Sequence, residues 1–247
     1  MTQEQTKHVT NSDAVAQEYA EVAEDLVCER LKEGGRREVL LRVKDLSVTL
    51  FTEDGALPAI TDLSFIMRKG ETLAVVGESG CGKSMTALSV MGLLPTPPAK
   101  ITNGSIELSG VDMTKLTADE MRQYRGNKLG MIFQEPMTSL NPVMTAGKQI
   151  REGILAHNPK MDKKEADARA LRMIKLVGIP APEKVFKSYP HELSGGMRQR
   201  IMIAIALACQ PELLICDEPT TALDVTIQAQ ILQLIDRMRE ELNTAVM

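Results

Sequence analysis

Residues 77–84 read GESGCGKS, which fits the pattern Gly, four residues, Gly-Lys-Ser. The apolar residues 73–76 precede this stretch and predict a short buried strand. Met85, Leu88 and Met91 follow at helical spacing and predict a helix. Glycines let such a loop turn its N–H groups inward toward an anion, and a helix start adds a positive dipole. The stretch therefore predicts a phosphate-binding loop between a strand and a helix of an α/β fold.

The loop also assigns roles to individual side chains. Lys83 is expected to reach the β- and γ-phosphates of a nucleotide, and Ser84 is expected to ligate magnesium. The residues predicted to contact the nucleotide through this loop are Gly77, Glu78, Ser79, Gly80, Cys81, Gly82, Lys83, Ser84 and Met85.

The bulk composition limits the class of protein. The chain has 247 residues, of which 43% are hydrophobic and 25% charged, as in ordinary soluble globular proteins. The net charge of −4 provides no overall basic field for nucleic acid. The longest apolar run, residues 201–209, is far shorter than the roughly 20 residues of a spanning helix, and the N-terminus lacks an apolar signal core. We therefore expect a cytoplasmic chain that does not bind nucleic acid and meets a membrane only through a partner.

Residues 1–38 differ from the rest because they are polar and acidic, and we assign them to an N-terminal extension. A weak helical stripe inside it comprises Val15, Tyr19, Val22 and Leu26. Two interpretations stay open, a loosely attached tail and a docking helix for a partner.

Residues 39–247 are assigned to one domain with layers of different pattern. Residues 43–50 and 60–65 flank a turn at Asp54-Gly55 and, with 104–108, predict an antiparallel β-layer. Helical patterns predominate further on and predict a helical subdomain at about 141–205. The run 213–216 predicts a buried parallel strand, and a final amphipathic helix carries Ile231, Leu234, Ile235, Met238 and Leu242.

Two more motifs point to nucleotide chemistry. Residues 193–200 read LSGGMRQR, where Ser194 begins a helix and Gly195 and Gly196 leave backbone N–H groups uncovered, as in a second anion site. Residues 213–219 read LLICDEP and place two carboxylates at the end of the predicted parallel strand, where ligands bind in open α/β sheets. Asp217 is expected to hold magnesium, and Glu218 to act as general base toward water.

Together these motifs resemble the nucleotide-binding subunit of ATP-binding cassette (ABC) transporters over residues 39–247. The resemblance implies a P-loop NTPase with a RecA-like parallel-sheet core, an antiparallel β-subdomain and a helical subdomain. It also implies that Ser194, Gly195 and Gly196 complete the nucleotide pocket of an opposite subunit.

The resemblance extends the set of site residues. Gln134 matches the family's Q-loop glutamine, which touches the metal or the attacking water, and Asp224 matches a residue that works across the dimer interface. The implied cofactors are ATP and Mg²⁺. The implied catalytic residues are Glu218, Gln134 and Lys83, and the implied metal ligands are Ser84, Gln134 and Asp217.

Residues 133–142 (FQEPMTSLNP) and 217–232 (DEPTTALDVTIQAQIL) narrow the resemblance to ATPase subunits of oligopeptide and dipeptide importers, whose relatives carry nickel or glutathione. This implies an ATP-hydrolysing subunit at the cytoplasmic face of the inner membrane. Its implied partners are a second nucleotide-binding subunit, in a homo- or heterodimer, two transmembrane permease subunits and, indirectly, an extracytoplasmic solute-binding protein.

The chain departs from the family pattern at two places. The family's switch histidine follows the next strand, whereas His8, His157 and His191 all lie elsewhere, so we expect a C-terminally truncated subunit. The family also stacks an aromatic residue on adenine; here Leu50 takes that position, and Phe51 reaches the base only if a bulge shifts the register.

Two alternative functions remain open. The missing histidine allows a non-hydrolysing cassette that acts as a binding module. Non-transport ABC ATPases of DNA repair, chromosome organisation and the ribosome are a further alternative, although the long insertions typical of them are not found.

Cys81 lies inside the phosphate-binding loop beside Lys83 and a helix start, a setting that raises the reactivity of a thiol. We expect maleimide to label it and MgATP to protect it. The alternative is that Cys81 simply replaces a small serine.

Overall fold

The computed structural model describes residues 38–134, 139–221 and 224–247. The chain divides into two units, Met1–Glu38 and Val39–Met247. Apart from Glu38, the first unit lies outside the described residues, so its two interpretations stay predictions. No helix among the described residues is long and apolar enough to cross a membrane.

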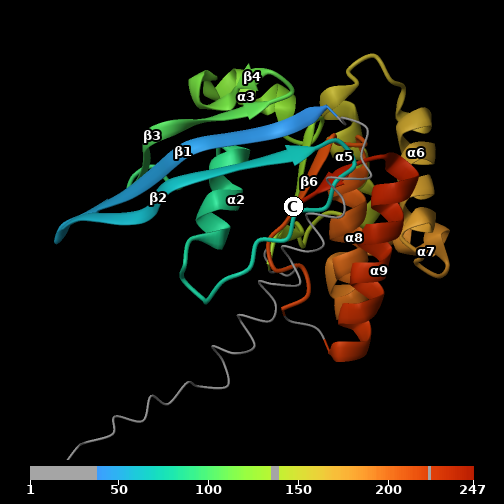
Figure 1. The fold of residues 1–247 in the computed structure, drawn as a ribbon. Coiled ribbons are helices and arrows are strands. Elements are labelled where there is room, and N and C mark those ends of the chain that lie inside the picture. Colours follow the sequence, from blue (N-terminus) through green and yellow to red (C-terminus); the bar gives the residue numbers. More distant parts are fainter. Residues whose placement is uncertain (1–37, 135–138, 222–223) are drawn as a thin grey trace, which may run out of the picture. The chain divides into compact units, whose positions relative to one another are not determined.

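An antiparallel sheet forms one layer of the second unit (Figure 1). Its strands are ordered β2-β1-β3-β4, and a tight turn that pairs Thr52 with Gly55 joins the first two. The predicted β-layer is confirmed, with longer strands than the sequence pattern indicated. Their bounds are β1 (Val39–Thr52), β2 (Gly55–Arg68), β3 (Ala99–Leu108) and β4 (Val111–Asp112).

A glycine in β3 allows close contact with β1. The ladder between these strands shifts register between Lys44 and Ser47, and Asp45 within the irregular stretch has a φ of 50°. Gly104 has a φ of +88°, and a Cβ built there would lie 2.5 Å from the backbone carbonyl carbon and oxygen of Asp45. A glycine inside a strand often marks such a bulge and close backbone approach.

A parallel sheet stands between the antiparallel layer and the helices. It consists of β5 (Leu129–Ile132), β6 (Leu213–Cys216) and β7 (Ala245–Val246) in that order. Leu213 and Ile215 pack in the core beneath the antiparallel sheet, whereas Leu214 packs in the core of the helical side. The prediction of a buried parallel strand at 213–216 is therefore confirmed, because both of its faces are covered.

The predicted buried strand at 73–76 is wrong. Thr72 and Val246 form an isolated parallel β-bridge, and the Leu73 N–H donates a hydrogen bond to the Val246 carbonyl oxygen. The pairing does not continue, and Val75 and Val76 are 44% and 88% exposed. The apolar pattern fails here because a strand needs a hydrogen-bonded neighbour, and the two-residue strand β7 pairs only as far as this point.

Among the described residues, the helix after Lys83, the helices within 141–205 and the final helix lie where the sequence pattern predicted them. The short helix α3 (Ala118–Tyr124) was not predicted, although Thr117 and Glu120 form a capping box at its start. Asp162 caps α6 by accepting hydrogen bonds from the backbone N–H groups of Lys164 and Glu165. The remaining helices are α2 (Lys83–Met91), α5 (Ala146–His157), α6 (Lys163–Leu176), α7 (Pro182–Lys187), α8 (Gly195–Leu207) and α9 (Val225–Leu242).

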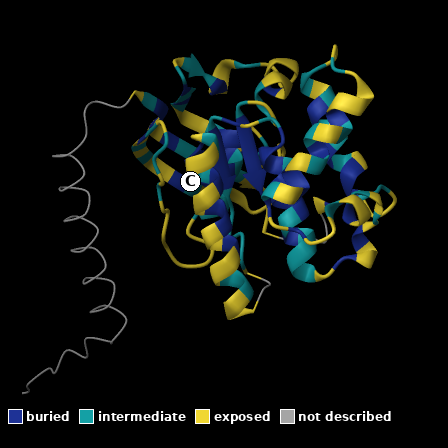
Figure 2. Ribbon diagram, turned by 90° about the vertical axis from the view of Figure 1, so that its right-hand side faces the viewer, coloured by how far each residue is buried: buried dark blue, intermediate teal, exposed yellow. Residues whose placement is uncertain are grey.

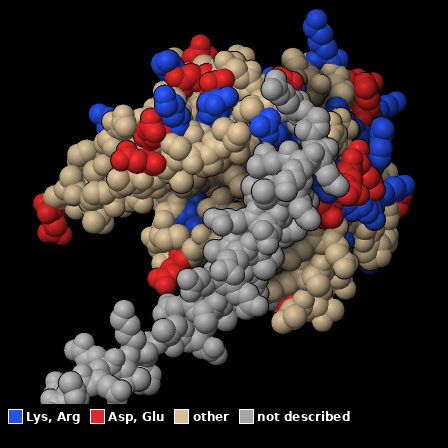
Figure 3. Space-filling model, in the orientation of Figure 1, with Lys and Arg blue, Asp and Glu red and all other residues tan. Residues whose placement is uncertain are grey.

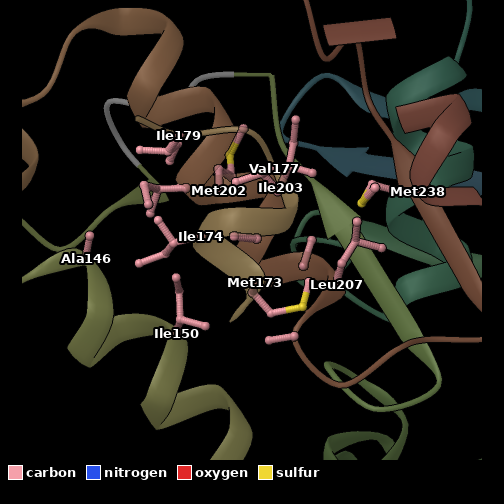
Figure 4. Packing of buried hydrophobic residues seen from close by; sticks show 14 of the residues in the cluster. Ala146, Ile150, Met173, Ile174, Val177, Ile179, Met202, Ile203, Leu207 and Met238 are labelled. Atoms are coloured by element: carbon pink, nitrogen blue, oxygen red, sulfur yellow. The ribbon is translucent and has the colours of Figure 1, made fainter. Parts of the chain in front are cut away.

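Helices α5 to α9 pack on one another on the far side of the parallel sheet (Figure 1). Figure 4 shows Ile150 of α5, Ile174 of α6 and Leu207 of α8 directed into one apolar cluster. The central strands and the inner helix faces are buried, while the outer faces are exposed (Figure 2). Helix α8 is buried around most of its circumference, which places it at the centre of this layer.

Candidate functional site

The phosphate-binding loop ends in glycines with left-handed backbones. Gly80 has a φ of +82° and Gly82 a φ of +97°, a region that residues with a side chain rarely adopt. Gly82 is the N-cap of α2, and no side chain caps this helix start. The free N–H groups of a first helical turn attract anions, so the loop and α2 offer a phosphate site built from backbone groups.

Lys83 projects from the first turn of α2 across the loop. Its Nζ donates hydrogen bonds to the carbonyl oxygens of Gly77 and Glu78, both at 2.8 Å. The same nitrogen lies 4.0 Å from Oε1 of Glu218. The ammonium group therefore stands between the loop and the carboxylate that follows β6, where a terminal phosphate would meet both.

Ser84 and Asp217 meet although 133 residues separate them in the sequence. The Ser84 hydroxyl donates a 2.9 Å hydrogen bond to Oδ1 of Asp217. A hydroxyl and a carboxylate oxygen fit Mg²⁺, which prefers hard oxygen ligands and takes most others from water and phosphate. Among the described residues, no group of three or more His, Cys, Asp or Glu side chains could hold a metal ion.

The Glu218 carboxylate is held in place by one side chain from the segment after β5 and by one from its own turn after β6. Nε2 of Gln134, after β5, donates to its Oε2 at 2.9 Å. The Thr221 hydroxyl lies 3.0 Å from the same Oε2 and 3.2 Å from the Glu218 carbonyl oxygen. The backbone of Glu218 has a φ of 46°, which is unusual for a residue with a side chain. Sequence reasoning placed Thr221 in a segment with Asp224 but did not predict its contact with Glu218; its position three residues after Glu218 in a turn is the signal that could have identified that contact.

These segments surround a cavity of about 430 Å³. Asp217 adjoins this lining through Ser84, whereas Gly77 and Glu78 contribute their carbonyl groups to Lys83. On the face that Figure 3 shows, Lys and Arg side chains are intermixed with Asp and Glu, without a broad basic area. The lining residues are Leu50, Leu57, Pro58, Ala59, Ser79, Gly80, Cys81, Gly82, Lys83, Ser84, Met85, Gln134 and Glu218.

The apolar end of the cavity is aliphatic. Leu50 pairs with Leu57 across the hairpin, and Phe51 pairs with Ala56 without a register shift between the two pairs. Leu50, Leu57 and Pro58 line the cavity, whereas Phe51 is not in its lining and is 51% exposed. The bulge that would bring Phe51 to a base is not found in this part of the ladder, so Leu50 takes the position.

The residues of the LSGGMRQR motif lie outside the cavity lining. The Ser194 hydroxyl caps α8 by accepting a 3.3 Å hydrogen bond from the Met197 N–H. Gly195 has open space where a Cβ would stand, and Gly196 approaches Ile227 of α9. Asp224 caps α9 in the same way, while residues 222–223 beside it lie outside the described residues.

Two of the three histidines are described, and neither lines the cavity. His191 stacks on Tyr189 with ring centroids 5.6 Å apart. His157 lies beside Gly126, where a Cβ would stand 2.8 Å from its Nε2.

Cys81 is exposed and lines the cavity, so we expect maleimide to modify it and MgATP to protect it. The other described cysteines are internal controls. Burial raises the pKa of the Cys216 thiol to about 12, and burial also raises the pKa of Cys209. Both thiols should therefore react slowly. Mass spectrometry of peptides after labelling measures each site separately; equal modification of Cys81 with and without MgATP would contradict the expectation.

Comparisons with known proteins agree with this arrangement. The family model described as ABC transporter matches residues 60–221. The chain is 52% identical over 208 residues to the oligopeptide transport ATP-binding protein AppD of Bacillus subtilis (strain 168), which covers 84% of this chain and 63% of that protein. It is 51% identical over 209 residues to the oligopeptide transport ATP-binding protein OppD of Escherichia coli (strain K12), with 85% and 61% covered. The chain therefore spans less than two thirds of the length of these relatives.

Solved structures share the fold. The dimeric post-hydrolysis structure of the ATP-binding cassette MJ0796 bound to ADP and Pi matches with a TM-score of 0.74 at 29% identity, covering 84% of this chain and 86% of that chain. The cbiO1 protein of Clostridium perfringens, part of the cbiONQ complex, matches with a TM-score of 0.70 at 26% identity, covering 85% and 77%. The predicted α/β P-loop fold with antiparallel and helical layers is confirmed.

Proposed function

The chain belongs to the ABC transporter family, and from this premise we propose that it binds ATP with Mg²⁺ and hydrolyses it to energise a membrane importer of peptides. The observation that carries the proposal is the convergence of three groups on one cavity: the Lys83 ammonium, the Ser84–Asp217 pair and the Gln134–Glu218 pair. A cation, a metal-ligating oxygen pair and an oriented carboxylate are what phosphoryl transfer to water needs.

Phosphate binding, metal binding and activation of water are assigned to different residues of the cavity. Backbone N–H groups of the loop and Lys83 bind the phosphates, and Leu50 with Leu57 forms an apolar surface for the base. Ser84 and Asp217 would hold Mg²⁺, which would supply positive charge next to the phosphate oxygens. Glu218 accepts a proton from the attacking water, while Gln134 and Thr221 fix the orientation of its carboxylate.

The proposed partners are inferred from the accessible residues of the LSGGMRQR motif and from the relatives. Ser194, Gly195 and Gly196 contact the nucleotide of a second cassette, in a homo- or heterodimer, which agrees with their place outside the cavity lining of their own chain. Dimeric MJ0796 supports this assembly. The names of AppD and OppD, both oligopeptide transport ATP-binding proteins, support peptide cargo. Two permease subunits and a place at the cytoplasmic face of the membrane are further parts of the proposal.

Nucleotide titration and phosphate release test the proposal. We expect saturable, Mg²⁺-dependent ATP binding and steady phosphate release, and we expect Lys83→Ala to reduce the release about 100-fold or more because a preorganised cation is lost. Lys163→Ala, at an exposed position at the start of α6, is the matched control and should not change the rate.

The same assay separates the rival functions. Binding without release above the Lys83→Ala level would favour a non-hydrolysing module, and absence of saturable binding would remove the proposal altogether.

A further inference from the structure

Gln199, the seventh residue of the LSGGMRQR motif, has a buried polar side chain without a role in the site described above. It lies in α8, is 1% exposed, and its Nε2 donates a 2.6 Å hydrogen bond to the carbonyl oxygen of Pro219. Much of the rest of α8 is apolar and packs in the helical core. Buried amides without a structural partner are costly, so this bond is a specific link between α8 and the segment after β6.

The link reaches the residue next to the proposed general base. Pro219 follows Glu218, whose left-handed backbone has a φ of 46° and whose carbonyl oxygen accepts from the N–H and hydroxyl of Thr221. A backbone in this region is maintained only when its surroundings hold it. The Gln199 amide fixes the Pro219 carbonyl, and Thr221 fixes the Glu218 carbonyl just before it. The direction of the Glu218 carboxylate therefore depends on the position of α8.

The first turn of the same helix carries the glycine motif, whose Ser194 is exposed and whose two glycines are half-buried. Ser194 is the N-cap of α8, and Gly195 stands one helical turn before Gln199, with open space at its Cβ position. A helix transmits a small displacement of its first turn along its axis because its internal hydrogen bonds keep it rigid. A contact made at Gly195 thus acts on the Pro219 carbonyl through a single rigid element.

We propose that Gln199 is a positioning residue that couples the glycine motif of α8, where a second cassette's nucleotide binds, to the orientation of Glu218 in the same chain. The proposal rests on the proposed function and deepens it, because it supplies a physical connection between the two nucleotide sites of a dimer. Gln199 contacts neither nucleotide and acts only through Pro219 and Glu218.

The test uses Gln199→Met, which keeps the length of the side chain and removes the donor, in the full chain. We expect kcat for ATP hydrolysis to fall about tenfold, the Hill coefficient for ATP to fall toward 1, and the Kd for ATP measured by titration to stay within about twofold. Hydrogen exchange of the peptide that contains Thr221 should become faster, because the turn loses one of its two anchors. Gln233→Met, at an exposed position of α9, is the matched control and should leave all four quantities unchanged.

A second variant keeps the test independent of one substitution. Gln199→Asn retains an amide that is one methylene too short to reach Pro219, and it should reproduce the loss of kcat and of cooperativity. Unchanged kcat and Hill coefficient in both variants, or loss of the folded state in both, would overturn the inference and leave Gln199 a structural residue. Absence of ATP hydrolysis by the unmodified chain would instead refute the proposed function.

Discussion

Replacing Glu218 by Gln is expected to lower the rate of ATP hydrolysis by about 100-fold or more while ATP still binds. The amide keeps the size of the side chain and can still contact Gln134 and Thr221, but it cannot accept a proton from water. General base catalysis is typically worth 10²–10⁴-fold, so the effect should fall on kcat and not on the Kd for ATP. Phosphate release under saturating MgATP, together with nucleotide titration, measures the two quantities separately.

Glu152→Gln is the matched control for this substitution. Glu152 is exposed on α5, remote in sequence from the loop and from the carboxylates after β6, and its change should not affect either quantity. A Glu218→Gln variant that keeps more than a third of the activity would show that another group accepts the proton. The proposed role of Glu218 would then be wrong even if ATP is hydrolysed.

Replacing Gly104 by Ala is expected to lower the free energy of unfolding by about 2–5 kcal/mol. Two costs add at this position: about 1–2 kcal/mol for a left-handed backbone with a Cβ, and about 1–3 kcal/mol for overpacking. The new methyl group would stand 2.5 Å from backbone atoms of Lys44 and Asp45, which cannot rotate away as a side chain could. Urea unfolding followed by circular dichroism gives the difference directly.

Gly110→Ala separates the two costs. Gly110 has a φ of +83°, close to that of Gly104, but a Cβ there would meet no atom within 4 Å. This control should lose only the conformational part, about 1–2 kcal/mol. If both variants lose the same free energy, β1 and β3 can move apart at the bulge, and the close approach is not important for stability.

The sequence predicted those parts of the fold whose signals are local. The antiparallel layer, the strand at 213–216 and the helix after Lys83 are marked by residues within each segment, and the structure contains all three. The predicted strand at 73–76 is wrong because its formation depends on more than a local signal. Its apolar pattern is local, but a strand also requires a partner, and the partner lies far away at Val246.

In the site as well, local sequence signals could be predicted and tertiary contacts could not. Motif spacing identified Lys83, Ser84, Asp217 and Glu218, and the structure brings these residues within reach of one another. Motif spacing could not identify Leu57 and Pro58 as residues that line the cavity, because their role depends on how the hairpin folds over the loop. The contacts of Thr221 and Gln199 were also missed, since their partners are defined by a turn and by the packing of α8.

Strand β6 contributes to two hydrophobic cores, because Leu213 and Ile215 pack in one and Leu214 and the partly buried Cys216 pack in the other. Because β6 contributes side chains to both cores, neither core is complete without this strand. Disorder that begins on one side removes the support of the opposite side, so the domain keeps or loses its order as a whole. Damage to the antiparallel sheet therefore reaches Asp217 and Glu218 through β6, the strand that they directly follow.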